Sequence, residues 1–158
     1  MKKFLKPAAL VAITIFTLAS CKKEETPNPG NNGTNTPPAP TKTELITSKT
    51  WKLSSATLSP AVMGETDYMK MIKDCDKDNT LKFNADKTLV IDNGSMRCNA
   101  MDPQTFSKTW ALNTNETVVS IGSSSFNLVD VNTSALKLSH SMTYNGTNYT
   151  VTEVYSGQ

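Results

Sequence analysis

The sequence predicts an all-β domain, an eight-stranded antiparallel up-and-down barrel with one short helix after the first strand. Two observations carry this prediction. From residue 105 onward, short strand patterns recur at even spacing between turn residues, and Asn145-Gly146 is the strongest hairpin signal of the chain. Regular short strands with turn signals are typical of a sandwich or barrel, and short connections between sequential strands favour a meander over a Greek key. Eight strands enclose an interior that side chains fill or that holds one small ligand.

The first predicted strand spans residues 50 to 58. Pro60 is expected to end it, because proline cannot donate a hydrogen bond to the ladder of a sheet. The short helix is placed at residues 65 to 73, where apolar residues recur at a spacing of three and four, as on one face of a helix. Thr66 or Asp67 could cap its N-terminus.

The stretch between Cys75 and Cys98 is the predicted centre of the sheet. Two strand patterns, at residues 80–84 and 88–92, are joined by the turn residues Asn84-Ala85-Asp86-Lys87. One cysteine lies just outside each end, so a bond between the two sulfurs would staple this hairpin. The remaining strands then extend the sheet, at residues 105–112, 117–121, 124–131, 135–144 and 148–156.

The register of the last hairpin follows from its turn. A type I′ turn needs positive φ at both central residues, which Asn145-Gly146 tolerates, so Tyr144 is expected opposite Thr147. Because side chains alternate along a strand, one face of the hairpin points into the barrel. That face carries Leu136, Leu138, His140, Met142, Tyr144, Tyr149, Val151, Glu153 and Tyr155. His140 and Glu153 are its polar members and lie diagonally across the strand pair, within reach of each other.

His140 and Glu153 are interpreted as polar groups at the floor or wall of a ligand cavity, where they orient an otherwise apolar guest. Together with Tyr149, Met142 and Trp110 they form the predicted ligand-binding set. The alternative is a structural pair near the end of the barrel, or a Glu153 that reaches solvent. Catalysis would require a nucleophile or a metal as well, and the single histidine of the chain has no visible triad partners. No enzyme activity, catalytic residue, metal site or cofactor is therefore predicted.

Residues 1 to 20 have the layout of a secretory signal peptide, with a lysine-rich start and an apolar run at residues 8 to 19. The run is too short to cross a bilayer as a helix, which takes about 20 apolar residues. It ends in Leu18-Ala19-Ser20-Cys21, which resembles the lipobox of bacterial lipoproteins. The resemblance implies acylation of Cys21, palmitate included, and cleavage just before it. The alternative is an ordinary signal peptide with a chance cysteine.

Residues 21 to 43 are predicted to form a disordered tether, because a Pro-, Asn-, Gly- and Thr-rich segment cannot bury enough apolar area to offset its ordering entropy. Residues 44 to 158 form the barrel domain, with a short helical or irregular lead-in up to Lys49. Near the lipidation site, Lys22-Lys23-Glu24-Glu25 resembles the surface-export signal of Bacteroidetes lipoproteins. Display on the cell surface is therefore expected, with a periplasm-facing lipoprotein as the alternative.

Assigning Cys21 to lipid leaves Cys75 and Cys98 as an even pair in an oxidising compartment. A disulfide closing a loop of about 24 residues would add about 3 kcal/mol of stability. Metal binding by the same two thiols is the alternative, although neighbouring Cys or His ligands are missing. The acids at positions 74, 76 and 78 alternate as in a calcium loop, but the positions that should hold its Gly and its bidentate Glu hold other residues.

Several motifs, in their order along the chain, resemble the lipocalin-like domain of Bacteroidetes lipoproteins. They are a tryptophan early in the first strand, Cys75-Asp76-Lys77-Asp78-Asn79 before a strand with Phe83, the turn Asn84-Ala85-Asp86-Lys87-Thr88, Cys98, and Thr109-Trp110-Ala111-Leu112. The resemblance covers Leu45 to about Tyr155. It implies an eight-stranded antiparallel barrel with a disulfide between Cys75 and Cys98, and it implies no particular ligand. Lys87 departs from the pattern, because the hairpin of the family usually has Gly there.

Charge limits the partners. Residues 1 to 43 carry six Lys and two Glu, a net +4, so the remaining residues carry −2 of the total +2. The barrel domain has no basic patch, and nucleic acid is not expected as a partner. The leading hypothesis is a monomeric outer-membrane lipoprotein, held by its lipid anchor, whose barrel binds a small, largely apolar ligand. The alternative is a non-catalytic surface interaction or accessory module with a side-chain-filled barrel.

Overall fold

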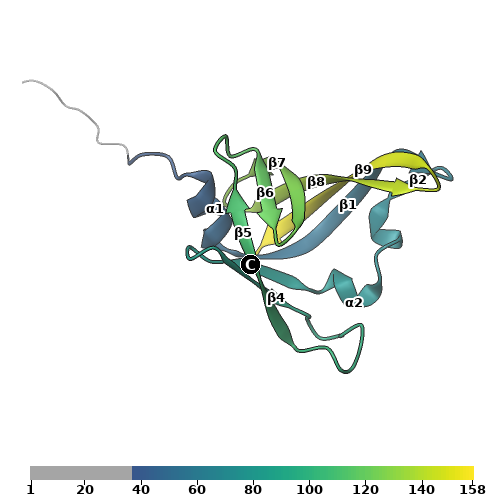
Figure 1. The fold of residues 1–158 in the computed structure, drawn as a ribbon, viewed down its shortest axis with the longest axis horizontal. Helices are drawn as coiled ribbons and strands as arrows, with labels where there is room; N and C mark the ends of the chain where they lie inside the picture. The colour runs from purple at the N-terminus through teal and green to yellow at the C-terminus, as the bar shows by residue number, and fades with distance from the viewer. Residues whose placement is uncertain (1–36) are drawn as a thin grey trace, which may run out of the picture. The chain divides into compact units, whose positions relative to one another are not determined.

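Nine antiparallel strands form one sheet in residues 37 to 158, the part of the chain that the structure, a computed structural model, describes (Figure 1). The strands are β1 (Thr50–Val62), β2 (Glu65–Asp67), β3 (Thr80–Phe83), β4 (Thr88–Asp92), β5 (Thr105–Leu112), β6 (Val118–Ile121), β7 (Ser124–Val131), β8 (Ala135–Tyr144) and β9 (Thr147–Gly157). From β3 to β9 each strand pairs with the next, and β1 pairs with both β3 and β9. These eight strands close a barrel, while β2 lies beside β1 only. The predicted eight-stranded antiparallel up-and-down barrel is confirmed.

Residues Pro38–Gln158 form one folded unit. The predicted signal peptide, the lipidation site at Cys21 and the predicted tether up to residue 36 lie outside the described residues. Within residues 37 to 158, no helix has both the length and the apolar character needed to cross a membrane.

Helix α1 (Lys42–Ser48) precedes β1 and packs against β3 and β7, at one end of the barrel. A capping box starts it: Thr41 Oγ1 accepts from Glu44 N at 3.2 Å, and Glu44 Oε2 accepts from Thr41 N at 2.7 Å. Ile46 is fully buried, and its carbonyl accepts a 2.7 Å hydrogen bond from Trp51 Nε1. The helix begins within the segment predicted as tether, so the last residues of that segment belong to the folded unit.

The barrel is filled at the α1 end. Trp51, Phe83 and Trp110 are buried there, and the rings of Phe83 and Trp110 meet edge to face with centroids 5.2 Å apart. Trp110 Nε1 donates to the carbonyl of Asn84 at 3.0 Å, which satisfies its polar atom. The buried cluster is completed by Ile46, Leu89, Val119, Leu128, Val131, Leu136 and Leu138. Along β8 burial then falls, from Leu136 and Leu138 through half-buried His140 to exposed Tyr144.

The predicted register of β8 and β9 is confirmed at every pair, from Leu136 opposite Tyr155 to Tyr144 opposite Thr147. The prediction that the whole face lies inside the barrel is wrong at its outer end, where Tyr144 is 48% exposed. The reason is that the pairing of β8 with β7 stops at Ser139. Beyond that point β8 pairs with β9 alone, so the barrel is open on that side and the inner face of β8 becomes exposed.

Pro60 does not end the first strand, contrary to the prediction, since β1 continues to Val62. The β1–β9 pairing ends at Ser59, opposite Thr150, so Pro60 follows the last pair and its missing N–H leaves no gap in that ladder. The strand then pairs with β2 through Val62 and Glu65.

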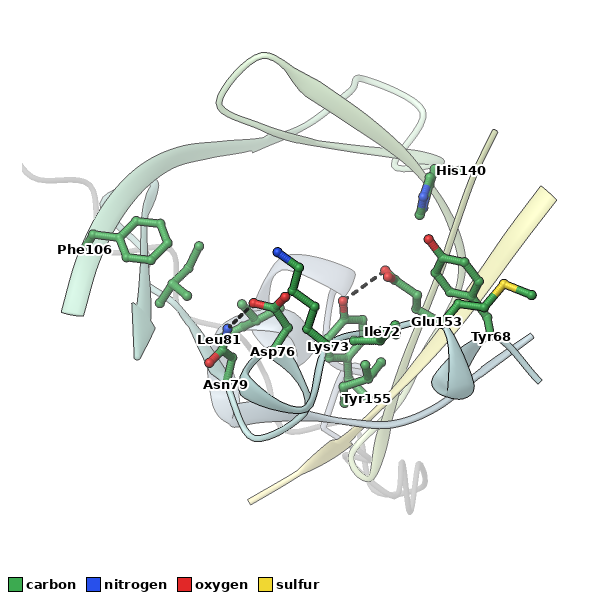
Figure 2. A pocket seen from close by; sticks show the side chains of 13 residues that line it. Tyr68, Ile72, Lys73, Asp76, Asn79, Leu81, Phe106, His140, Glu153 and Tyr155 are labelled. Atoms are coloured by element: carbon green, nitrogen blue, oxygen red, sulfur yellow. Dashed lines mark hydrogen bonds between the residues drawn. The ribbon is translucent and has the colours of Figure 1, made fainter. Parts of the chain in front are cut away.

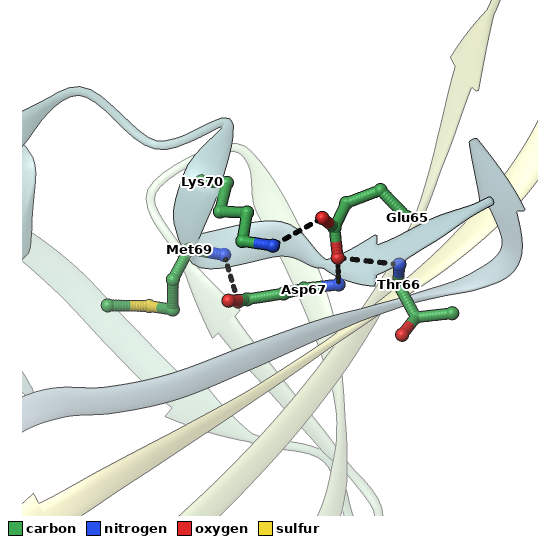
Figure 3. A network of polar contacts seen from close by, with 5 residues as sticks. All are labelled: Glu65, Thr66, Asp67, Met69 and Lys70. Carbon is green, nitrogen blue, oxygen red and sulfur yellow. Dashed lines mark hydrogen bonds and ion pairs between the residues drawn. The ribbon is translucent and has the colours of Figure 1, made fainter. Parts of the chain in front are cut away.

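A short helix follows β1 as predicted, but it is α2 (Asp74–Lys77), and residues 65 to 73 are not one helix. They form β2, the 3₁₀ turn η1 (Tyr68–Lys70) and a bend. Figure 3 shows the cause: Glu65 accepts from the backbone N–H of Thr66 and Asp67 and from Lys70 Nζ, and Asp67 accepts from Met69 N at 3.0 Å. Side chains that bond nearby backbone groups compete with a regular helix. Asp67, one of the two predicted caps, caps η1 instead.

The turn from Asn84 to Lys87 holds Lys87 at φ 69°. Lys87 N donates to Asn84 O at 3.1 Å, and Asp86 Oδ1 accepts from Thr88 N at 2.9 Å. Left-handed backbone favours glycine, so Lys87 holds a conformation that is uncommon for a residue with a side chain. The Lys87 ammonium lies 4.4 Å from the centre of the Trp110 ring, a cation–π contact that glycine could not make.

Candidate functional site

A cavity of about 500 Å³ occupies the barrel at the end away from α1. Its barrel side is lined by residues of six strands: Leu53, Leu81, Ile91, Phe106, His140, Glu153 and Tyr155. Its other side is lined by residues 68 to 79, here called the lid segment, through Tyr68, Met71, Ile72, Lys73, Asp76 and Asn79. Figure 2 shows Phe106 and His140 on opposite sides of the cavity, with Lys73 and Asp76 from the lid segment between them. The cavity starts where the filled core ends.

Glu153 and Tyr155 form the polar centre of the cavity. They are two residues apart on β9 and therefore face the same side of the sheet. The Tyr155 hydroxyl donates to Glu153 Oε2 at 3.0 Å (Figure 2). Burial, and then the adjacent Glu153 carboxylate, raise the pKa of the Tyr155 hydroxyl well above its usual range. Tyr155 is consequently a neutral donor that fixes one oxygen of Glu153.

His140 lies on β8 diagonally across from Glu153, because His140 pairs with Val151 and Glu153 pairs with Leu138. Its ring meets Phe126 edge to face, with centroids 5.3 Å apart. The Nδ1 atom of His140 is buried and has no hydrogen-bond partner within residues 37 to 158. Buried polar atoms are nearly always paired, so this unpaired one is unusual, and it belongs to a residue that lines the cavity.

A second hollow of about 440 Å³ meets the cavity at the same three polar residues. His140, Glu153 and Tyr155 line both, and the second hollow adds Phe126 and three serines, Ser124, Ser125 and Ser141. The site thus has an apolar lobe under the lid segment and a serine-lined lobe beside β7. The polar residues lie where the lobes join.

The lid segment is fastened to the loop after β4. Cys75 of α2 is joined to Cys98 of that loop by a disulfide, which confirms the predicted pairing. Asp78 Oδ2 accepts from Ser95 N at 2.7 Å and from Ser95 Oγ at 2.6 Å. These hydrogen bonds hold the pKa of the Asp78 carboxyl below its usual value. The disulfide and the two hydrogen bonds from Ser95 to the Asp78 carboxylate therefore fix the C-terminal part of the lid segment.

The predicted site residues are divided by the structure. His140 and Glu153 line the cavity. Met142 instead lines another apolar hollow of about 380 Å³, which shares Tyr68 and Met71 with the cavity. Tyr149 pairs opposite Met142. Trp110 lies in the filled core, 2% exposed, because the filling reaches further along the barrel than a strand pattern reveals.

Sequence reasoning missed most of the cavity. Tyr155 was on the predicted inner face and could have been chosen from its place beside Glu153. Leu81, Ile91 and Phe106 alternate correctly for an inner face, but alternation does not tell a filled level of the barrel from an open one. The lid residues carried no usable signal, because their positions depend on the local hydrogen bonds of Glu65 and Asp67.

The acidic and sulfur groups near the lid serve local structure. Sγ of Cys75 and Cys98 and a carboxylate oxygen of Asp76 lie within 4.8 Å of one another, but the two sulfurs are bonded to each other, so neither is a thiolate that could bind a metal. Asp74 pairs with Lys77 at 2.6 Å.

No protein-family model matches the chain, and no curated protein matches it either. Among solved structures, a complex of bovine odorant binding protein with a selenium-containing odorant is similar over 78% of this chain and 76% of that chain, at 13% sequence identity and a TM-score of 0.43. A likeness of this size says nothing about the ligand or activity of this chain. The barrel itself is established by the strand pairings, which run from β1 through β9 and back to β1.

Proposed function

We propose that the barrel binds a small, largely apolar ligand in the cavity under the lid segment, and that a lipid on Cys21 holds the chain at the outer membrane. The observation that carries the binding role is the cavity itself. Its volume of about 500 Å³ falls within the range of small-molecule sites, about 300 to 1,000 Å³. Like such sites, it combines apolar walls with a few convergent polar groups.

The rival role is an interaction module with a solid barrel. The filled core at the α1 end favours it in part, since Trp51, Phe83 and Trp110 leave no room there. The buried core ends before His140, however, and Nδ1 of His140 has no hydrogen-bond partner within residues 37 to 158. A barrel that served only as a rigid support would be expected to bury apolar side chains at this level. Ligand binding is therefore the preferred function.

A fluorescent probe tests the binding role. N-phenyl-1-naphthylamine brightens on entering an apolar site, so its titration into the full chain measures occupancy of the cavity. Phe106→Ser removes an aromatic wall and should weaken binding about fivefold, or ~1 kcal/mol. Met101→Ser is the matched control, because Met101 is 88% exposed and does not line the cavity. Absence of saturable binding, or equal binding by both variants and the unchanged chain, would contradict the proposal.

The anchor rests on the sequence, in which the apolar run ends in Leu18-Ala19-Ser20-Cys21. Two or more acyl chains give stable membrane attachment, whereas one chain gives only marginal binding. The test is incorporation of an alkyne-labelled palmitate during expression in a bacterial host. Cys21→Ser should abolish the label, and the double variant Cys75→Ser with Cys98→Ser should keep it. Label that persists in Cys21→Ser would show that this cysteine is not the acceptor.

A further inference from the structure

We infer that the ligand of this cavity is a cationic amphiphile, an apolar chain or ring system that carries a protonated amine, and that Glu153 receives the amine. This inference rests on the proposed binding function and adds the charge of the ligand to it. Three features of the site carry it: the charge balance at the centre, the free capacity of Glu153 to accept hydrogen bonds, and the apolar wall beside it.

The charge at the centre of the site is negative. Glu153 is half-buried between the two lobes, and within residues 37 to 158 it forms no ion pair. Its neighbour Tyr155 remains neutral because the pKa of its hydroxyl is raised. Lys73 and Asp76 also line the cavity, but both lie exposed on the lid segment. Water and salt screen exposed charges much more than half-buried ones. The charge of Glu153 therefore determines that the cavity favours a cationic ligand over an anionic one.

The Glu153 carboxylate also has free capacity to accept hydrogen bonds. Tyr155 supplies the single hydrogen bond that Glu153 accepts from the described residues, and Nδ1 of His140 has no partner there. His140 lies diagonally across β8 and β9 from Glu153 and lines both lobes with it. An ammonium has three donors and no acceptor, so it fits the oxygen of Glu153 that Tyr155 leaves free, whereas a carboxylate would add a second anion beside Glu153.

The rest of the ligand is apolar. Leu81, Ile91 and Phe106 face the lid segment across the apolar lobe, and the serine-lined lobe on the other side of Glu153 leaves room for water around a charged head group. Burial of a chain against the first lobe supplies affinity in proportion to its area. The amine at the junction then sets the orientation.

Displacement of bound N-phenyl-1-naphthylamine by dodecylamine, dodecanol and dodecanoate, each below its micelle concentration, tests the inference on the full chain at neutral pH. The three share one apolar chain and differ in head-group charge. Dodecylamine should bind about tenfold more tightly than dodecanoate, the ratio that a charged hydrogen bond of ~1.4 kcal/mol produces, with dodecanol between them. An equal ranking, or a preference for dodecanoate, overturns the inference and leaves the proposed function standing. Failure of all three to displace the probe overturns both.

Two variants test whether Glu153 is the residue that produces the preference for the amine. Glu153→Gln removes the central charge with little change of shape and should bring the amine and the carboxylate to within about twofold of each other. Asp76→Asn removes an exposed negative charge from the same cavity and should leave the tenfold preference in place. Equal losses in both variants would mean that the overall charge, and not Glu153, selects the ligand. If Glu153→Gln does not fold, Glu153→Leu replaces it: this variant also removes the charge and should likewise reduce the preference to about twofold, and a tenfold preference that survives in it would overturn the role of Glu153.

Discussion

The carboxylate of Asp78 holds both the backbone N–H and the hydroxyl of Ser95, at 2.7 and 2.6 Å, and so ties the lid segment to the loop after β4. Hydrogen bonds to the ionised form lower the pKa of this carboxyl in the folded protein. The unfolded chain has no such bonds, so the contribution of Asp78 to stability is present above its unfolded pKa, about 4. It is lost as pH falls through the lower folded value.

The first prediction therefore concerns pH. Asp78→Asn should lower the melting temperature at neutral pH, and the difference from the unchanged chain should shrink as pH falls below about 4. Melting curves of the two proteins across this pH window measure it. Asp74→Asn serves as the control, because Asp74 makes an exposed i,i+3 pair with Lys77 and little stability is expected from such a pair. A difference that stayed constant with pH would mean that the charge of Asp78 is not what holds Ser95.

The second prediction concerns Gly94, which faces Asp78. Gly94 has φ 63°, and a Cβ there would overlap the Asp78 carboxylate. Gly94→Ala should therefore lower the free energy of unfolding by about 2 to 3 kcal/mol. This is the sum of the strain of a left-handed alanine and the displacement of the Asp78 carboxylate from Ser95. Gly146→Ala is the matched control: φ is 77° and nothing lies within 4 Å of the new Cβ, so only the strain of about 1 kcal/mol remains. Denaturant titration gives both values, and equal costs would contradict the overlap.

The third prediction concerns the disulfide. Its ends are 23 residues apart, and removing a cross-link over such a loop should cost about 3 kcal/mol. The double variant Cys75→Ser with Cys98→Ser, unfolded by denaturant, measures this cost. The unchanged chain in reductant should behave as the double variant does, and the double variant should not respond to reductant. Because Cys75 belongs to the lid segment, N-phenyl-1-naphthylamine binding should weaken at the same time. Unchanged binding would show that the lid holds its position without the cross-link.

The sequence predicts those parts of the fold that follow from local rules. Asn145-Gly146 determines a turn, the turn determines the pairing, and the pairing puts His140 diagonal to Glu153. The same rule cannot tell how far the barrel is filled. Trp110 and His140 both alternate inward, but one lies in the core and the other beside a cavity, because side chains from several strands meet at each level. The conformation of the lid segment could not be predicted from its apolar spacing either. The Glu65 carboxylate accepts hydrogen bonds from the backbone of the next two residues, and these bonds replace the expected helix.

The last prediction concerns Met63, which is 99% exposed and has φ 52° at the turn between β1 and β2. With Gly64 at φ 81° it forms a turn whose two central residues are both left-handed, a conformation that Asn and Gly adopt readily and Met does not. Met63→Asn should therefore raise the free energy of unfolding by about 0.5 to 1 kcal/mol. Met101→Asn, also highly exposed, should change it by less than about 0.5 kcal/mol. Denaturant titration of both variants tests this, and a loss of stability in Met63→Asn would show that the apolar hollow beside Met142 and Tyr144 gains more from the methionine side chain than the turn loses.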